Sequence, residues 1–436
     1  MIVIIGGGIS GLTLAYFLEK NNVEYRLFEK SAVPGGFIQS EKIDGYSLEY
    51  GPNSLLCGEK VNDFLEELGL KNEIIEANEV SNSRYIIRNG KPVKIPSSPI
   101  SLLFGRFFSF KTKLKIFREL RLKPHAERQE ETLTAMMDRH FGNEVVQYLL
   151  KPFIAGIYAG DPDHLVASYA FPKLKEYERK HGSILKGFIK NKGGARRKTV
   201  SFKEGMQQLP QTIFKSINNA SLQKEIIGLS KNNAKYVVKL RDEEIEADKI
   251  VFASSPNVMG SLCESLYGQK FSTVLSALKC PSISAVHSVY NKKDIAFELK
   301  GFGALNPQCE DYFIAGTIWS SSVFSGKIVE DNVLLTSFVG GMQYPNQNKI
   351  DEQSLLDSVH KELSKFYGIK AKPLFEKVTK WDKSIPQYGI ELKEVRKQID
   401  LLEKDNIFVA SNWLNGISIE DCIKNAKALA FRLSNY

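Results

Sequence analysis

The residues best placed to do chemistry are three glycines and one acidic residue near the N-terminus. Gly6, Gly8 and Gly11 follow an apolar run that ends at Ile5, and Glu29 stands eighteen residues after Gly11. This spacing allows a tight turn at Gly6, close approach of a pyrophosphate at Gly8 and close helix–strand packing at Gly11. A carboxylate at Glu29 can accept hydrogen bonds from both ribose hydroxyls of an adenosine, and it would repel the 2′-phosphate of NADP. The pattern therefore predicts a dinucleotide site for FAD or NAD.

A strand, a helix and a second strand must hold these residues in place. We expect a strand over 1–5, a helix over 12–21 and a strand over 23–29, which is the order of a βαβ dinucleotide unit. The N-terminus of the helix would offer unpaired N–H groups to the phosphates. Gly35 and Gly36 follow soon after the acidic residue and favour an extended FAD, although an ordinary loop explains them too.

Two distant segments are expected to complete the same sheet. Residues 249–254 and 406–411 are short apolar runs that both end in Ala-Ser, and each suits a buried parallel strand. The second leads into a helix over 419–433 that Ser418 can cap, with Asp421 in the acidic capping-box position. That helix could direct its dipole at the pyrimidine edge of a flavin, or it could be purely structural.

Composition narrows the class of protein. A chain of 436 residues with 43% hydrophobic residues indicates a folded protein of two or three domains. The net charge of +9 suits nucleic acid, an anionic membrane or an acidic ligand, but no nucleic-acid-binding motif accompanies it. Five dispersed cysteines and six histidines without paired spacing predict neither a disulfide framework nor a metal site. No apolar run reaches the ~20 residues of a membrane span, so we expect a soluble or peripheral cytoplasmic protein.

Two further segments have a recognisable organisation. Residues 84–88, Asn89-Gly90 and residues 91–95 predict a hairpin, with Arg84 at its open end. Residues 111–151 are expected to be mostly helical. Within 100–128, aromatic and aliphatic side chains alternate with cations, as at an anionic bilayer surface or on a solvated helix with a core-facing stripe. They are Leu102, Leu103, Phe104, Phe107, Phe108 and Phe110 among Arg106, Lys111, Lys113, Lys115, Arg118 and Arg121.

Taken together, these segments resemble the flavin-containing amine oxidase superfamily and, within it, the protoporphyrinogen oxidase family. The resemblance covers nearly the whole chain, and five short motifs in the same order make chance improbable. They are Gly51-Pro52-Asn53-Ser54, residues 157–162, residues 201–206, Gly301-Phe302-Gly303, and residues 412–422. Two segments depart from the pattern: Phe37 and Gln39 stand where many members carry an arginine, and Asn415 replaces a common glycine.

The resemblance implies non-covalent FAD held by residues from several segments. They are Gly6, Gly8, Ile9, Ser10, Gly11, Glu29, Lys30, Gly35, Gly36, Phe37, Gln39, Gly51, Pro52, Asn53, Ser54, Ile226, Trp413, Ile417 and Ser418. In fold class it implies an α/β protein: a discontinuous Rossmann-like FAD-binding domain (1–78, 200–256 and 398–436), an inserted α+β substrate domain (79–95 and 257–397) and a helical, membrane-associating region (96–199).

The chemistry implied by the resemblance is the six-electron oxidation of protoporphyrinogen, with O2 as acceptor and peroxide as by-product. The flavin carries this reaction, so no catalytic side chain is expected. Arg84 would grip a propionate bidentately, and Phe302 would pack on a pyrrole ring. The other expected substrate contacts are Gly303, Leu305, Gly156, Ile157 and Tyr158. A membrane on the cytoplasmic side is the expected partner surface, nucleic acid is not expected, and a homodimer is left open.

Three alternatives remain open at this stage. A coproporphyrinogen oxidase of the oxygen-dependent bacterial type would act on a tetracarboxylate and would need a more cationic pocket. An amine oxidase would need an aromatic cage and often a lysine near the flavin, neither of which is evident. An escort-type binding module shares the fold without catalysis, and a colourless purified protein would favour it.

Overall fold

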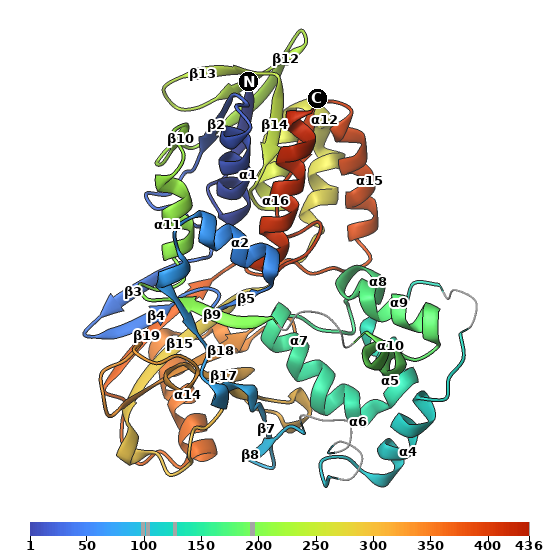
Figure 1. Ribbon diagram of the computed structural model, residues 1–436, viewed down its shortest axis with the longest axis vertical. Coiled ribbons are helices and arrows are strands. Elements are labelled where there is room, and N and C mark those ends of the chain that lie inside the picture. Colours follow the sequence, from blue (N-terminus) through green and yellow to red (C-terminus); the bar gives the residue numbers. More distant parts are fainter. Residues whose placement is uncertain (97–100, 102–104, 125–128, 192–196, 436) are drawn as a thin grey trace.

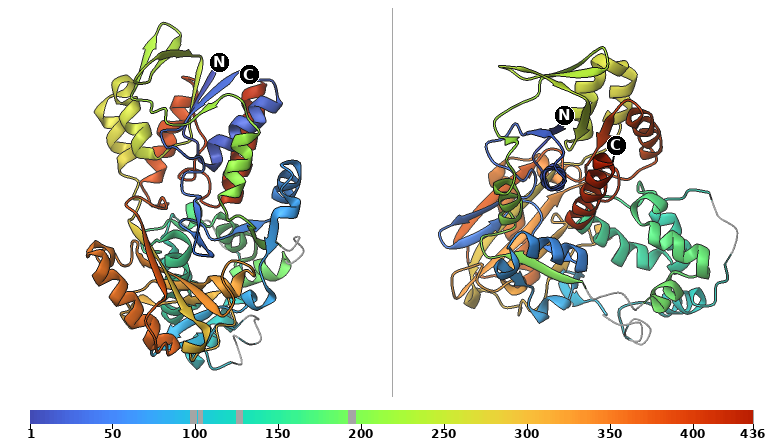
Figure 2. Two further views of the ribbon diagram at one scale, coloured as in Figure 1. Left: turned by 90° about the vertical axis from the view of Figure 1, so that its left-hand side faces the viewer. Right: turned by 45° about the horizontal axis from the view of Figure 1, so that its top comes forward.

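The computed structural model describes residues 1–96, 101, 105–124, 129–191 and 197–435 (Figure 1). Its upper part holds both chain termini, its lower left part holds a large sheet, and a group of helices lies at the lower right. The two ends of the chain stay close in every view (Figure 2). A hydrogen bond of 3.0 Å from Asn21 Nδ2 to Ser434 Oγ joins them directly.

The upper part is built on a parallel sheet with the strand order β10-β2-β1-β14-β20. Its strands are β1 (Ile2–Ile5), β2 (Tyr25–Phe28), β10 (Ala220–Ser221), β14 (Lys249–Phe252) and β20 (Ile407–Val409). β1 pairs in parallel with both β2 and β14, and β20 pairs in parallel with β14. The expected α/β fold is therefore confirmed, and distant segments of the sequence do complete the N-terminal sheet.

Helices cover both faces of this sheet because its strands are apolar on both sides. Ile2 and Ile4 pack on the face that carries α1 (Ile9–Lys20), α2 (Glu59–Glu67), α11 (Gln208–Lys215) and α16 (Ile419–Ser434). Val3 and Ile5 pack on the opposite face, which carries α12 (Pro256–Ser276) and α15 (Leu392–Glu403). An antiparallel sheet of β11 (Gly228–Asn232), β12 (Lys235–Lys239) and β13 (Glu244–Ala247) joins that second core.

The lower part is a seven-stranded sheet with the order β19-β15-β18-β17-β16-β7-β8. Its strands are β7 (Tyr85–Arg88), β8 (Lys91–Lys94), β15 (Ile283–Asn291), β16 (Gly303–Leu305), β17 (Gly316–Trp319), β18 (Asn332–Gly340) and β19 (Phe375–Trp381), with α13 (Ser320–Val323) and α14 (Glu352–Tyr367). The predicted hairpin is β7–β8, turning on Asn89 and Gly90, which both have positive φ. Between the two parts lie β3 (Ser40–Ile43), β4 (Tyr46–Glu49), β5 (Leu55–Cys57), β6 (Ile74–Glu76) and β9 (Lys198–Phe202).

Among its described residues, the helical region contains no strand before β9, which begins at Lys198. Its helices are α4 (Phe110–Glu119), α5 (Leu133–Phe141), α6 (Asn143–Val145), α7 (Lys151–Tyr158), α8 (Ala167–Ala170), α9 (Pro172–His181) and α10 (Ile184–Lys190), with a π-helical turn at Val146–Leu150. None of the helices in the described part of the chain combines the length and the apolar character needed to cross a bilayer. Leu102, Leu103 and Phe104 lie outside the described residues.

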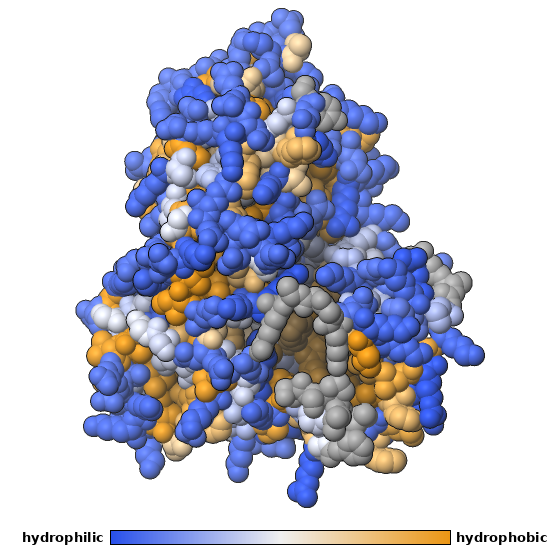
Figure 3. All heavy atoms as spheres, in the orientation of Figure 1, coloured by the Kyte–Doolittle hydropathy of each residue, from blue (hydrophilic) through white to orange (hydrophobic). Residues whose placement is uncertain are grey.

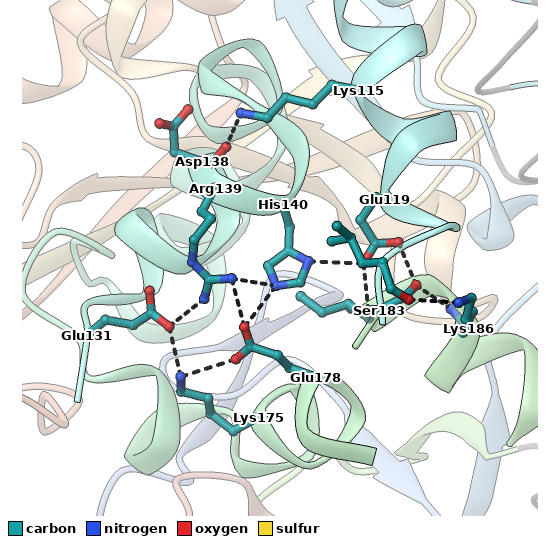
Figure 4. A network of polar contacts seen from close by, with 12 residues as sticks. Lys115, Glu119, Glu131, Asp138, Arg139, His140, Lys175, Glu178, Ser183 and Lys186 are labelled. Atoms are coloured by element: carbon teal, nitrogen blue, oxygen red, sulfur yellow. Dashed lines mark hydrogen bonds and ion pairs between the residues drawn. The ribbon is translucent and has the colours of Figure 1, made fainter. Parts of the chain in front are cut away.

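A buried polar network ties these helices together around His140 (Figure 4). His140 Nδ1 lies 3.0 Å from Glu119 on α4, and Nε2 lies 3.2 Å from Glu178 on α9. Burial alone would lower the pKa of His140, but the hydrogen bonds to both carboxylates outweigh it and raise that pKa. Arg139 and Lys175 also contact Glu178, at 2.7 and 3.2 Å. The His140 imidazole therefore holds α4 and α9 against α5.

This network predicts a stability that depends on pH. Because the folded pKa of His140 is raised, its contribution is complete below about pH 6.5 and is lost as the pH rises through the folded pKa. His140→Gln should lower the free energy of unfolding by about 3 kcal/mol in mildly acidic buffer, since it leaves the buried carboxylate of Glu119 without its cation. Thermal unfolding from about pH 6 to about pH 9 measures this.

The matched control is His164→Gln, because His164 is exposed. The control should follow the wild type across the pH range, whereas His140→Gln should show a weaker dependence above about pH 6.5. Equal melting curves for His140→Gln and the wild type at acidic pH would contradict the assignment.

Candidate functional site

The turn between β1 and α1 has the geometry that a dinucleotide phosphate requires. Gly6 has a φ of +114°, which other residues rarely adopt. A Cβ on Gly11 would lie 2.0 Å from the Gly6 carbonyl oxygen, whereas a Cβ on Gly8 would have nothing within 4 Å. Gly8 is the N-cap of α1, and the buried Ile9 and Ser10 begin the helix. The backbone here is open to a ligand beside N–H groups that lack helical acceptors.

Glu29 lies directly beside the glycine turn. Its Oε2 accepts a hydrogen bond of 2.7 Å from the Gly7 N–H, and its Oε1 accepts one from a backbone N–H two residues further on. A carboxylate keeps lone pairs for further donors, so a ribose can still be bound. The Glu29 carbonyl accepts from the Lys224 N–H at 2.9 Å, which brings the chain leading to Ile226 alongside. Lys30, the next residue, is exposed.

The second glycine pair packs against the first. The Gly35 N–H donates to the Gly7 carbonyl at 2.8 Å, and a Cβ on Gly36 would lie 3.3 Å from Gly8 Cα. Gly35 and Gly36 both have positive φ. They therefore extend the bare backbone surface that begins at Gly8, as an extended cofactor requires.

Residues 37–54, which follow the second glycine pair, lead toward the lower sheet. Phe37 is exposed, and Gln39 Nε2 donates to the Gly36 carbonyl at 3.0 Å. A Cβ on Gly51 would lie 1.8 Å from the Phe37 carbonyl oxygen, so this contact admits only glycine. Asn53 lines a small cavity together with Phe302, which joins an expected cofactor residue to an expected substrate residue. The half-buried Pro52 and Ser54 flank Asn53.

The loop before α16 is held as its capping pattern predicts. The Ser418 hydroxyl accepts from the Asp421 N–H at 3.0 Å, which confirms the N-cap. Trp413 is fully buried and its Nε1 donates to the Ser254 carbonyl at 2.9 Å. Its ring faces the interior, so contact with a flavin would come through its backbone, whereas Ile417 is half-buried. Acidic Glu420 and Asp421 occupy the first turn of α16 and oppose part of its positive end.

Arg84 and Phe302 lie together at the edge of the lower sheet. The Arg84 guanidinium carbon lies 4.7 Å from the centre of the Phe302 ring. The Arg84 residue is exposed, yet the atoms around its guanidinium lower its pKa by desolvation. A Cβ on Gly303 would lie 2.1 Å from the Thr317 carbonyl oxygen, which explains the glycine after Phe302. In the space-filling view, hydrophobic residues line the visible part of a recess between the lower sheet and the helices (Figure 3).

The expected substrate wall on α7 lies against β16. A Cβ on Gly156 would lie 2.8 Å from Leu305 Cδ2, so α7 meets β16 at this point. Gly156 and Ile157 are exposed, but Tyr158 is buried and donates to the Ala170 carbonyl at 3.2 Å. The Tyr158 ring therefore packs into the protein, and only its backbone stands near the wall. Arg84, Phe302, Leu305 and Gly156 thus form one group.

Comparison with known proteins decides the family. The family model described as flavin containing amine oxidoreductase matches residues 9–433, which is nearly the entire chain. The chain belongs to this family. It is a flavin-dependent oxidoreductase whose cofactor is FAD, and the open backbone at Gly8 fits such a cofactor.

Individual family relatives carry porphyrinogen names. Protoporphyrinogen oxidase 2 of Arabidopsis thaliana is 29% identical to this chain, covering 100% of the chain and 94% of the relative. Coproporphyrinogen III oxidase of Bacillus subtilis (strain 168) is 26% identical, with coverage of 98% and 96%. A crystal structure from Exiguobacterium sp. 255-15, provisionally named a protoporphyrinogen oxidase, has a TM-score of 0.83 at 20% identity, covering 100% of this chain and 98% of its own. That likeness shows the shared fold.

The structure adds residues that the sequence did not single out. Lys327 Nζ lies 3.1 Å from Glu49 in a buried ion pair that lines the cavity shared by Asn53 and Phe302. Burial raises the pKa of Glu49 even though Lys327 opposes it. The Trp381 ring meets the Phe37 ring with centroids 5.1 Å apart. Neither group has a local sequence signature, because its partners come from distant parts of the chain.

Proposed function

We propose that this protein oxidises protoporphyrinogen IX to protoporphyrin IX, with O2 as electron acceptor and hydrogen peroxide as by-product. The observation that carries the proposal is Arg84 stacked on Phe302 beside the apolar wall of Leu305 and Gly156. A flexible apolar macrocycle with two carboxylates needs such a combination of one cation and flat apolar surface. Relatives named protoporphyrinogen oxidase support the choice of substrate.

In the proposed reaction, the residues of the site orient the macrocycle and exclude water from it. FAD, when bound, supplies a two-electron acceptor, so a six-electron oxidation takes three turnovers. Arg84 binds one propionate bidentately and fixes the orientation of the macrocycle. Phe302 packs on a pyrrole ring, and the apolar wall removes water from the reacting methylene. The backbone at Gly8 and the carboxylate of Glu29 hold the adenosine diphosphate half of the cofactor.

Coproporphyrinogen III is the second candidate substrate, because relatives from Bacillus subtilis and Staphylococcus aureus carry that name. It has four carboxylates and would favour a site with several free cations. Among the described residues near the recess, Lys327 is paired with Glu49, and Arg88 donates to the Phe107 carbonyl at 2.7 Å and approaches Glu144 at 3.6 Å. Arg84 has no described carboxylate partner, and this one arginine beside Phe302 supports the dicarboxylate.

Anaerobic addition of each porphyrinogen, followed by aerobic turnover, tests this choice. We expect protoporphyrinogen to bleach the flavin absorbance faster and to turn over with the higher kcat/KM. Faster oxidation of coproporphyrinogen would reverse the assignment. If neither porphyrinogen bleaches the flavin, both candidate substrates are rejected and an amine substrate is favoured.

We further propose that the helical region contacts the anionic inner face of the cytoplasmic membrane. Phe110 is 82% exposed and Phe117 is 42% exposed, both on α4 among lysines, whereas Phe107 and Phe108 are buried. Phe107 and Phe108 thus belong to the core, and the exposed apolar face belongs to α4. Exposed aromatics between cations are typical of helices that lie on anionic bilayers.

The double variant Phe110→Ser/Phe117→Ser should bind vesicles of phosphatidylglycerol and phosphatidylcholine about tenfold less tightly, since two aromatic rings no longer leave water. Sedimentation with the vesicles measures this. Phe431→Ser is the matched control, because Phe431 is 70% exposed but lies on α16 of the upper part. Unchanged vesicle binding by the double variant would reject a membrane contact at α4.

A further inference from the structure

Two adjacent buried residues, Gln387 and Tyr388, join the two sides of the proposed site. They lie in the chain between β19 and α15, and they are 4% and 2% exposed. Neither reaches the surface that a substrate could touch. Their side chains contact two different segments, the C-terminal end of α7 and the loop before α16.

Tyr388 holds the loop before α16. Its hydroxyl donates to the Asn412 carbonyl and accepts from the Gly416 N–H, both at 2.6 Å. Burial raises the pKa of this phenol, so it remains a neutral donor. The loop is also held by Arg396, which donates to the Leu414 carbonyl at 3.0 Å. The backbone that would meet the flavin is therefore fixed from inside the protein.

Gln387 holds the end of α7. Its Nε2 donates to the Tyr158 carbonyl at 2.8 Å, where the helix stops and Ala159 takes a left-handed conformation. A Cβ on Gly160 would lie 2.4 Å from Gln387 Oε1, so the chain after α7 closes tightly over the amide. The Tyr388 carbonyl also accepts from the Val166 N–H at 2.9 Å. This end of α7 carries the expected substrate wall at Gly156 and Ile157.

We propose that Gln387 and Tyr388 are a pair of positioning residues that divide one task, in which Tyr388 fixes the flavin loop and Gln387 fixes the substrate wall. The two side chains are successive in the chain, yet each is hydrogen-bonded to a different side of the proposed site, so loss of one set of hydrogen bonds should disturb mainly that side. Placement of reacting groups to within an ångström strongly affects the reaction rate, so residues that position the two sides should affect that rate. The inference rests on the proposed function, because it uses the proposed wall and the proposed flavin contacts.

The test compares Tyr388→Phe with Gln387→Leu, each of which keeps side-chain size and removes hydrogen bonds. Tyr388→Phe should weaken FAD binding about tenfold, shift the flavin absorption bands and lower kcat, with KM for protoporphyrinogen unchanged. Gln387→Leu should raise KM about tenfold with FAD affinity and absorption bands unchanged. If both residues had a purely structural role, both variants would melt at a lower temperature, and the effects on FAD binding and on KM would not separate between them.

Tyr236→Phe is the matched control. Tyr236 is 1% exposed and donates to the Asp405 carbonyl at 2.5 Å, so it is a buried tyrosine of the same core. It should lose stability but keep wild-type FAD affinity, spectrum and KM. If Tyr388→Phe behaves like this control, or if both variants change all parameters alike, the inference is wrong. A wild-type protein that binds FAD but oxidises no porphyrinogen would reject the proposed function instead, and the FAD affinity of Tyr388→Phe would still report on the loop.

Discussion

Gly8→Ala should yield a folded but colourless protein whose affinity for FAD has fallen at least about a hundredfold. Gly8 adopts extended backbone angles that alanine accepts, and its new Cβ would meet nothing within 4 Å in the protein. The same Cβ would occupy the space through which a pyrophosphate reaches the N–H groups of α1, and charge-assisted hydrogen bonds there are worth about 1.5–3 kcal/mol each.

Flavin absorbance after purification and titration of the apoprotein with FAD measure the effect. Gly58→Ala is a matched control, because Gly58 is also an N-cap glycine with extended backbone, and its Cβ would meet a side chain rather than backbone, the Glu420 carboxylate at 3.0 Å. Gly11→Ala is less informative, since its Cβ would clash with the Gly6 carbonyl oxygen and disturb the fold itself. A yellow Gly8→Ala protein with wild-type FAD affinity would show that the phosphates bind elsewhere.

Arg84→Ala should raise KM for protoporphyrinogen about a hundredfold while FAD content stays intact. The guanidinium has no described carboxylate partner and stacks on Phe302, so it is free to pair with a carboxylate of the substrate. The KM of Arg84→Lys should lie between those of the wild type and Arg84→Ala, because an ammonium keeps the charge but not the bidentate geometry. Steady-state kinetics with protoporphyrinogen IX measure all three proteins.

Esterified substrate gives this prediction its sharpest control. Protoporphyrinogen IX dimethyl ester has no carboxylate, so wild type and Arg84→Ala should oxidise it with similar kcat/KM. Arg432→Ala controls for the loss of an arginine elsewhere, since Arg432 lies on α16 and pairs with Glu403 at 2.8 Å. Loss of flavin from Arg84→Ala, or an equal penalty with the ester, would show that Arg84 does not bind the carboxylate.

The amino-acid sequence alone determined the features that depend on local spacing. The glycine turn, the two strands around it, the Asn-Gly hairpin and the Ser418 cap follow from short-range steric and hydrogen-bonding rules, and each is present. The apolar runs at 249–254 and 406–411 also predicted their place in the sheet, because a strand buried on both faces has few alternatives.

Only the tertiary structure decided which side of each element faces the site. The sequence left open whether the aromatic residues of 100–128 face a bilayer or the core, and it did not show which way the side chain of Trp413 points; in the structure Phe107, Phe108 and Trp413 are all buried. Sequence analysis missed Gln387, Tyr388 and the Glu49–Lys327 pair altogether. The reason is physical: the role of a buried polar or aromatic side chain is set by partners tens or hundreds of residues away, and those partners meet only when the chain folds.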